Sequence, residues 1–235
     1  MDKTLKCKRR KGMVRGFLPF SLFTFLLLLT SCGELFEVNE EDAPLGQVFM
    51  ERRQVDLMVG DSYKLPVSLN LAENIDATLH FQSPDNAIVQ LRGDTVDAVA
   101  PGIIFVSVEA AGGALRDSCL VTVHPRWQVD PTQFQCDMVV FAQVTVNGQP
   151  FGEGMMVGAF NESTEELCGV GTILTHDGQD YMLLRIFSHD NSHENIVLRC
   201  YDRSRALIVQ AEEPIAFSAD DTMGTLSGLY PLVFD

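Results

Sequence analysis

From Gly46 onward, hydrophobic and polar residues alternate in short runs that are separated by turn-forming residues. Val55, Leu57 and Val59 alternate up to a Gly60-Asp61 turn, and similar runs recur as far as residue 123. A period of two places one face of each run in a core and the other in solvent, which is the pattern of a half-buried β-strand. Seven such runs predict a two-sheet sandwich over residues 46–124.

The alternation stops at His124-Pro125-Arg126, where proline prevents the preceding strand from continuing its hydrogen-bond ladder. We predict a domain boundary here. In residues 125–235 a long apolar run ends at Asn147-Gly148, a dipeptide typical of a tight β-hairpin. Strands are predicted at residues 134–146, 155–160, 167–174, 181–187, 196–201, 206–210 and 214–217. This pattern favours a second sandwich over a barrel, so the predicted fold class is all-β with two tandem β-sandwiches.

The N-terminal residues follow a different pattern. Seven basic residues up to Arg15 precede an apolar stretch that ends at Leu29-Thr30-Ser31-Cys32. This is the arrangement of a secretory signal peptide, with the basic part held on the cytoplasmic side of the membrane. The alternative is a retained transmembrane helix, but the stretch from Phe17 to Thr30 has 14 residues, against about 20 needed to cross the hydrocarbon core. We therefore predict that residues 1–31 are cleaved.

Leu29-Thr30-Ser31-Cys32 resembles the lipobox of bacterial lipoproteins. The resemblance implies that the Cys32 thiol receives a diacylglyceryl group and that the freed amine receives a further acyl chain, for which palmitate is expected. Several acyl chains together anchor a protein firmly. Residues 32–45 then form an acidic tether without bases. Acidic residues directly after the cysteine resemble the signal that sends some Gram-negative lipoproteins to the outer face of the outer membrane, although a solvated linker has the same composition.

Charge narrows the choice of partners. Residues 1–31 hold seven of the 17 basic residues and one of the 32 acidic residues, so residues 32–235 carry 10 basic and 31 acidic residues and a formal charge of −21. A chain this acidic repels phosphate backbones and anionic headgroups, so we predict no nucleic-acid partner and membrane attachment only through the lipid anchor. Solubility at a crowded surface accounts for the acidity without a cation-binding role.

Residues 48–123 carry a family resemblance. It rests on Val59-Gly60-Asp61-Ser62-Tyr63-Lys64-Leu65, Phe81-Gln82-Ser83-Pro84-Asp85, Asp94 to Gly102, and Cys119 to Val123. These segments resemble a group 2 bacterial immunoglobulin-like domain, a module found in intimin- and invasin-type adhesins. The resemblance implies a spacer or adhesive module without catalytic residues or a cofactor.

The second half resembles a β-sandwich module at the C-terminus of uncharacterised surface lipoproteins. The matching residues are Trp127, Val129-Asp130-Pro131, Met138, Gly158-Ala159-Phe160, Cys168-Gly169 and Tyr201-Asp202. The chain departs from the pattern at Met155 and Met156, where an acidic residue is often expected, and at Gly169, where an arginine is. The resemblance implies architecture and location, and it names no ligand.

Four cysteines remain after the signal peptide and Cys32 are set aside, and an exported location permits disulfides. We predict Cys168–Cys200 as the first pair to test, because both residues lie in strand-like runs of one domain. Buried thiols that act as small apolar side chains are the alternative. Cys168 with His176 and a carboxylate would suit a small hydrolase, but no recognised catalytic motif occurs, and the prediction is that the protein is not an enzyme.

Ligand-binding candidates come from loops and aromatic residues. His189 and His193 lie four residues apart beside carboxylates, but the Asp, Asn and Ser between them favour a solvated loop over a metal-binding helix. Trp127 and Tyr181 are the aromatic candidates for a sugar platform. We therefore predict an outer-membrane lipoprotein at the cell surface that binds a glycan or a protein, with loops 161–166 and 188–195 as contact surfaces. A periplasm-facing assembly or accessory subunit is the alternative.

Overall fold

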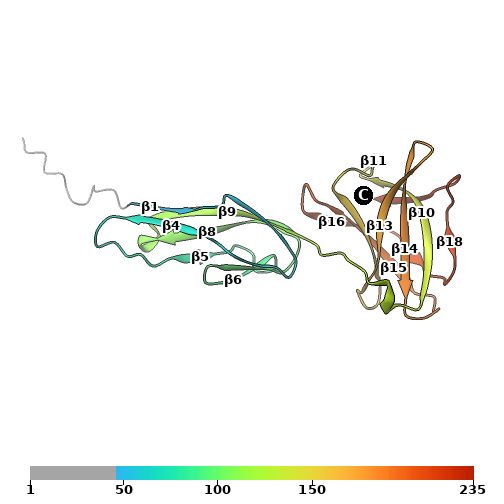
Figure 1. Cartoon of the computed structure of the whole chain (residues 1–235), viewed down its shortest axis with the longest axis horizontal. Helices are drawn as coiled ribbons and strands as arrows, with labels where there is room; N and C mark the ends of the chain where they lie inside the picture. Colours follow the sequence, from blue (N-terminus) through green and yellow to red (C-terminus); the bar gives the residue numbers. More distant parts are fainter. Residues whose placement is uncertain (1–45) are drawn as a thin grey trace, which may run out of the picture. The chain divides into compact units, whose positions relative to one another are not determined.

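The computed structural model describes residues 46–235, and these residues form an all-β fold, as the alternation predicted (Figure 1). In this part of the chain, the only helical elements are single 3₁₀ turns at Ala111–Gly113 and Pro131–Gln133. No helix among residues 46–235 has the length and apolar character to span a membrane. The predicted signal peptide at residues 1–31, Cys32 and the tether at residues 32–45 lie outside the described residues.

The first part of the described chain contains three small sheets around one core. Their hydrogen-bonded orders are β1-β4, β2-β9-β8-β5 and β3-β7-β6. The strands are β1 Gly46–Met50, β2 Gln54–Met58, β3 Ser62–Lys64, β4 Val67–Leu71, β5 His80–Gln82, β6 Val89–Arg92, β7 Thr95–Ala98, β8 Gly102–Ala110 and β9 Leu115–His124. Strand β1 was not predicted from the sequence, and it pairs antiparallel with β4.

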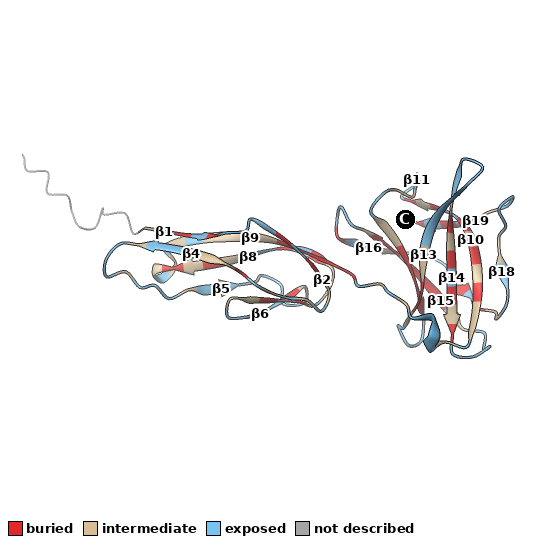
Figure 2. Cartoon of the chain, in the orientation of Figure 1, coloured by how far each residue is buried: buried red, intermediate tan, exposed pale blue. Residues whose placement is uncertain are grey.

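Alternating side chains of these strands build the first core. Val106 and Val108 of β8 and Val121 and Val123 of β9 are fully buried, while the residues between them are more exposed or form the outer face. Successive side chains of a strand point to opposite faces of the sheet. The burial colours of Figure 2 follow this alternation along the strands. The run pattern that predicted the strands is therefore also the pattern that fills the core.

The second part forms one continuous sheet of ten strands, in the order β11-β10-β14-β13-β12-β15-β16, with β17 beside β15 and with β18 and β19 beside β10. The strands are β10 Cys136–Val146, β11 Gln149–Pro150, β12 Met155–Asn161, β13 Leu167–His176, β14 Gln179–Ser188, β15 Asn195–Asp202, β16 Leu207–Gln210, β17 Ile215–Ala216, β18 Thr222–Met223 and β19 Tyr230–Phe234. Buried residues from most of these strands share one core, so the sheet bends around it.

Two features of this sheet show what local sequence does and does not decide. Asn147 and Gly148 have φ values of 48° and 69°, the left-handed pair that a tight hairpin turn requires, and this hairpin was predicted. Strand β19 was not predicted. It lies parallel to β10, and its side chains Leu232 and Phe234 are buried in the core.

The two cores draw on separate parts of the chain. One contains buried residues between positions 48 and 123, and the other contains buried residues between positions 138 and 234. The described residues, 46–235, belong to one compact unit. The boundary between residues 46–124 and 125–235 stays a prediction.

Candidate functional site

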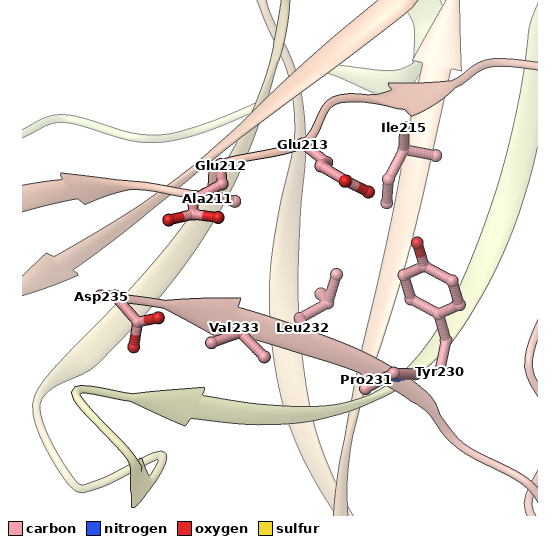
Figure 3. A pocket seen from close by; sticks show the side chains of 9 residues that line it. All are labelled: Ala211, Glu212, Glu213, Ile215, Tyr230, Pro231, Leu232, Val233 and Asp235. Atoms are coloured by element: carbon pink, nitrogen blue, oxygen red, sulfur yellow. The ribbon is translucent and has the colours of Figure 1, made fainter.

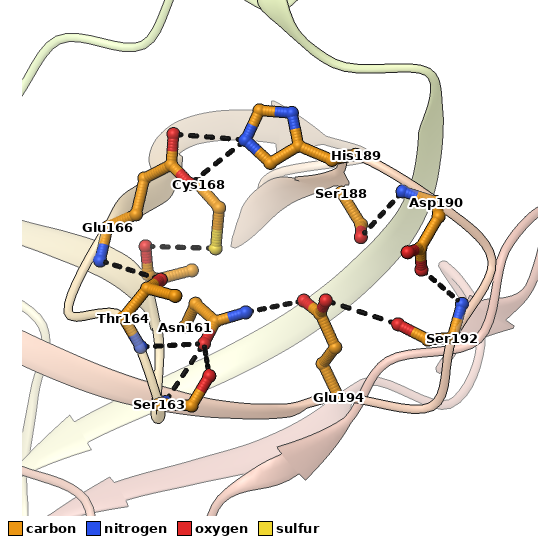
Figure 4. Close-up of polar contacts among 11 residues, drawn as sticks. Asn161, Ser163, Thr164, Glu166, Cys168, Ser188, His189, Asp190, Ser192 and Glu194 are labelled. Carbon is orange, nitrogen blue, oxygen red and sulfur yellow. Dashed lines mark hydrogen bonds and ion pairs between the residues drawn. The ribbon is translucent and has the colours of Figure 1, made fainter.

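The two loops that were predicted as contact surfaces lie side by side in the structure (Figure 4). Residues 162–166 connect β12 to β13, and residues 189–194 connect β14 to β15; the two predicted loops also include the strand ends Asn161, Ser188 and Asn195. The sheet order β14-β13-β12-β15 is antiparallel throughout, so both connections leave the sheet at the same end. Strand topology therefore brings together two segments that are separate in the sequence.

Asn161 organises the first loop. Its side-chain oxygen accepts hydrogen bonds from the backbone N–H of Ser163 at 2.9 Å, the hydroxyl of Ser163 at 2.7 Å and the backbone N–H of Thr164 at 3.1 Å. Asparagine favours turns because its short amide satisfies nearby backbone donors. Glu165 has a φ of 59°, and its N–H donates to the Asn161 carbonyl at 2.9 Å, which closes the turn.

Polar contacts join the first loop to the second. The Asn161 amide donates to a Glu194 carboxylate oxygen at 2.5 Å. The Glu162 N–H donates to the Asn195 carbonyl at 2.9 Å, and the Asn195 amide donates back to the Glu162 carboxylate at 2.8 Å. Glu194 also accepts a hydrogen bond from the Ser192 hydroxyl at 3.2 Å. We call this pair of cross-linked loops, residues 161–166 and 188–195, the paired-loop surface.

Asp190 shapes the second loop in the same way. Its carboxylate accepts the N–H of Ser192 at 2.7 Å, and its own N–H donates to the Ser188 hydroxyl at 3.3 Å. The hydrogen bonds from Ser192 lower the pKa of Asp190, with a smaller contribution from the nearby His189. The loop is thus ordered by its own side chains, and no helix forms between His189 and His193, as predicted.

An aromatic row continues from this surface. The His189 ring stacks on Phe134 with centroids 4.7 Å apart, and Phe134 stacks on Phe187 at 5.8 Å. The Arg185 guanidinium lies over the Phe187 ring at 5.2 Å. His189 also faces Glu166, with Nε2 and a carboxylate oxygen 3.0 Å apart. Phe134 and Phe187 are half-buried and His189 is exposed, and aromatic rings edged by polar groups can contact both an apolar face and hydroxyl groups of a ligand.

His189 and His193, the two histidine candidates for ligand binding, lie in the second loop. Both imidazoles are exposed, and of the two only His189 makes a side-chain hydrogen bond among the described residues. No group of three or more His, Cys, Asp or Glu side chains in residues 46–235 is arranged to hold a metal ion.

Trp127 packs onto the sheet. The half-buried indole meets the ring of Phe160 edge-on at 5.4 Å and that of Tyr201 at 6.2 Å. It rests on Gly158, where an added Cβ would lie 3.1 Å from the indole Cε3. Trp127 therefore anchors the start of the second half to strands β12 and β15.

Tyr181 lies at the other end of β14 from His189. Eight residues separate the two positions, which is about 26 Å along an extended strand. Tyr181 and Phe151 line a separate hollow of about 170 Å³, together with Ile173 and Asp180. The four ligand-binding candidates thus fall into different places, and only His189 and His193 belong to the paired-loop surface.

The predicted disulfide is absent from the structure, in which all four cysteines of the described chain are free thiols. Cys168 lies on β13 and Cys200 on β15, and β12 runs between these strands. Neighbouring strands are about 4.8 Å apart, so the two Cα atoms are separated by at least about 10 Å, beyond the limit of about 7 Å for a disulfide. Cys168 and Cys200 are instead buried thiols, which was the alternative to a disulfide. Burial raises the pKa of Cys168 to about 12 and that of Cys200 to about 11.

The Cys168–His176 pair is not formed either. The two residues lie near opposite ends of β13, eight positions or about 26 Å apart, and His176 is exposed. The Cys168 thiol lies in hydrogen-bond reach of the Ala159 carbonyl at 3.3 Å and stays protonated near neutral pH because burial raises its pKa. It is therefore not an activated nucleophile.

No family model matches the chain, and no curated protein matches it. Among solved structures, it is similar to domains 1–6 of the surface layer protein SbsC, with 15% identity, coverage of 75% of this chain and 26% of that chain, and a TM-score of 0.30. The adhesin InvE of Yersinia pseudotuberculosis has 13% identity, coverage of 73% and 58%, and a TM-score of 0.25. The gamma-CGTase of alkalophilic Bacillus clarkii has 9% identity, coverage of 80% and 28%, and a TM-score of 0.25.

Proposed function

We propose that the protein is an outer-membrane lipoprotein, held by acyl chains on Cys32 and facing the cell exterior, that binds a glycan or a protein without catalysis. Residues 46–124 serve as a spacer of the group 2 bacterial immunoglobulin-like type, and residues 125–235 carry the contact surface. The lipobox, the acidic residues that follow it and the acidic composition support the location.

The observation that carries the binding role is the cross-linking of the paired-loop surface. Asn161–Glu194 and Glu162–Asn195 hold two loops in one arrangement before any ligand arrives. A ligand then loses less free energy to the ordering of these loops, because their conformation is already fixed. Loops on a rigid β-scaffold are also where recognition is usually found.

The groups exposed on this surface suit a polar ligand. Carboxylates and amides accept hydrogen bonds from sugar hydroxyls or from basic side chains, and the stacked rings of His189 and Phe134 offer an apolar contact. The same chemistry serves glycan and protein ligands, so a screen must include both classes.

The test is a binding screen of the full chain, purified in detergent, against glycans and host proteins. For any ligand found, an Asn191→Ala/His193→Ala variant removes exposed side chains of the second loop. The matched control is His176→Ala/Gln179→Ala, which removes exposed side chains from the β13–β14 hairpin at the far end of the sheet. We expect the loop variant to lose binding and the hairpin variant to keep it. If the loop variant keeps binding and the ligand contacts only residues 46–124, the contact surface belongs to the first part of the chain and the assignment to residues 125–235 is wrong.

The location has its own test. Protease added to intact cells should degrade the protein, and metabolic labelling with palmitate should be lost in a Cys32→Ala variant. A protein that stays whole until the outer membrane is opened would instead be a periplasm-facing accessory subunit.

A further inference from the structure

The second sheet bends around its core without closing. On one edge β19 pairs only with β10, and on the other edge β16 and β17 pair only with β15. Between these edges lies a hollow of about 190 Å³, lined by residues 211–215 on one side and by β19 with Asp235 on the other (Figure 3). A closed barrel has no free edge, so this opening is the place where the sheet can accept another strand.

The free edge of β19 has unused backbone groups. Phe234 turns its carbonyl toward β10, because this oxygen accepts the N–H of Asn147 at 2.7 Å. Backbone polar groups alternate along a strand, so Tyr230 and Leu232 also face β10, while Pro231, Val233 and Asp235 face the open side. Pro231 has no N–H to leave unpaired there. The N–H groups of Val233 and Asp235 and the carbonyls of Pro231 and Val233 are therefore free to pair with an added strand.

The opposite edge is interrupted at the hollow. The Ala211 N–H donates to the Leu198 carbonyl at 2.9 Å, and pairing with β15 resumes only at Ile215. Glu212, Glu213 and Pro214 between these points belong to no strand. This break makes room beside β19 in a sheet that would otherwise bring its edges together.

Carboxylates surround the opening. Glu212 and Glu213 lie on one rim and Asp235 on the other, and the Tyr230 hydroxyl points into the same space (Figure 3). No Lys, Arg or His among residues 46–235 forms an ion pair with any of the three carboxylates. Like charges at a free edge oppose pairing with another acidic strand, including a second copy of this chain. They favour a basic strand, because its charges would neutralise them.

We propose that an extended basic segment of a partner protein adds to this sheet as a strand beside β19, with a Lys or Arg side chain in the hollow. Strand addition uses main-chain hydrogen bonds for affinity and side-chain pockets for specificity. The position differs from that of the paired-loop surface. Leu232 pairs with Val144 of β10 and Ser188 pairs with Cys136, which places the two sites about 26 Å apart along β10.

The first test uses the isotopically labelled full chain in detergent and two synthetic peptides, one of alternating lysine and valine and one of alternating glutamate and valine. We expect the lysine peptide to shift the amide signals of Val233 and Asp235 and to protect both amides from hydrogen exchange. Added salt should weaken this binding. Equal binding of the glutamate peptide, or binding of the lysine peptide without changes at these two amides, would overturn the proposal.

Two kinds of variant distinguish the contribution of the carboxylates to peptide binding from that of main-chain pairing. Glu212→Gln/Glu213→Gln should weaken binding about tenfold, because the two exposed ion pairs with the basic segment are lost. The matched control, Glu73→Gln/Glu153→Gln, removes two exposed carboxylates elsewhere and should leave the affinity unchanged.

Val233→Pro removes a backbone N–H that faces the open side and should abolish binding. If this variant fails to fold, the glutamine variant and the amide signals still decide the question. Concentration-dependent dimerisation that protects the same amides without peptide would assign the edge to a second copy and overturn the proposal.

Discussion

Replacing Asn161 by alanine tests whether the paired-loop surface is held together as the contacts indicate. Asn161 is buried, and its side chain accepts three hydrogen bonds within its own loop and donates one to Glu194 in the other. Alanine removes all four contacts at once. The strands on either side of both loops should keep their pairing in this variant, so the loss of stability should come from the loops alone.

The magnitude follows from the number and the exposure of these bonds. A hydrogen bond contributes about 0.5–1.5 kcal/mol net, and a partner left without one costs more when it is buried. The donors of Ser163 and Thr164 lie in an exposed loop and regain water, which keeps each loss near the lower end of that range. We therefore expect Asn161→Ala to lower the free energy of unfolding by about 2–3 kcal/mol.

The assay is equilibrium unfolding in urea, with Asn191→Ala as the control. Asn191 is an exposed asparagine of the neighbouring loop without a side-chain hydrogen bond among the described residues, so its replacement should change the free energy of unfolding by less than about 0.5 kcal/mol.

Asn161→Asp provides a second check. Aspartate keeps the acceptor but places a carboxylate against Glu194, so this variant should be more stable near pH 4 than at pH 7 relative to wild type. A loss below about 0.5 kcal/mol for Asn161→Ala, or equal losses at Asn161 and Asn191, would refute the idea that Asn161 joins the loops.

Three further predictions concern the rest of the described chain. Gly158→Ala should destabilise the protein by about 1–3 kcal/mol, because a Cβ would lie 2.8 Å from the Phe160 ring and 3.1 Å from the Trp127 ring; an unchanged melting temperature would contradict this. Iodoacetamide at pH 8 should label Cys168 in the unfolded but not in the folded chain, because burial raises its pKa to about 12; mass spectrometry of the native protein decides. Hydrogen bonds from Arg92 and then Ser62 lower the pKa of Asp97 to about 2. The ionised Asp97 therefore stabilises the folded chain above the unfolded-state pKa near 3.8, and this stabilisation is lost as the pH falls through about 2. Urea midpoints of wild type and Asp97→Asn should therefore differ at pH 7 and converge near pH 2.

Much of the strand layout was predictable because burial repeats with the period of a strand. Predicted runs at residues 155–160 and 181–187 became Met155–Asn161 and Gln179–Ser188, and the Asn147-Gly148 turn was read from two residues. Strands β1 and β19 were missed, since Gly46–Met50 and Tyr230–Phe234 are short and the latter contains a proline. Their pairing with β4 and β10 depends on residues far away in the sequence.

The candidate site was predictable only in part. Loops 161–166 and 188–195 were chosen because polar residues interrupt apolar runs, but their contact depends on the strand order β14-β13-β12-β15. The same order excludes the Cys168–Cys200 bond, since β12 separates the two thiols. The role of Trp127 as an aromatic candidate for a sugar platform stays a prediction, and its packing against Phe160 and Tyr201 could not be predicted from the sequence.

The sequence by itself determined the all-β class, the positions of most strands and the acidic charge, because alternation, turn chemistry and composition are local properties. Only the tertiary structure decided which strands are neighbours, which loops meet, and that the second sheet stays open between β16 and β19. Those outcomes depend on the burial of one shared core. A core brings together residues that are far apart in the sequence, and the local sequence pattern does not show which of them will be in contact.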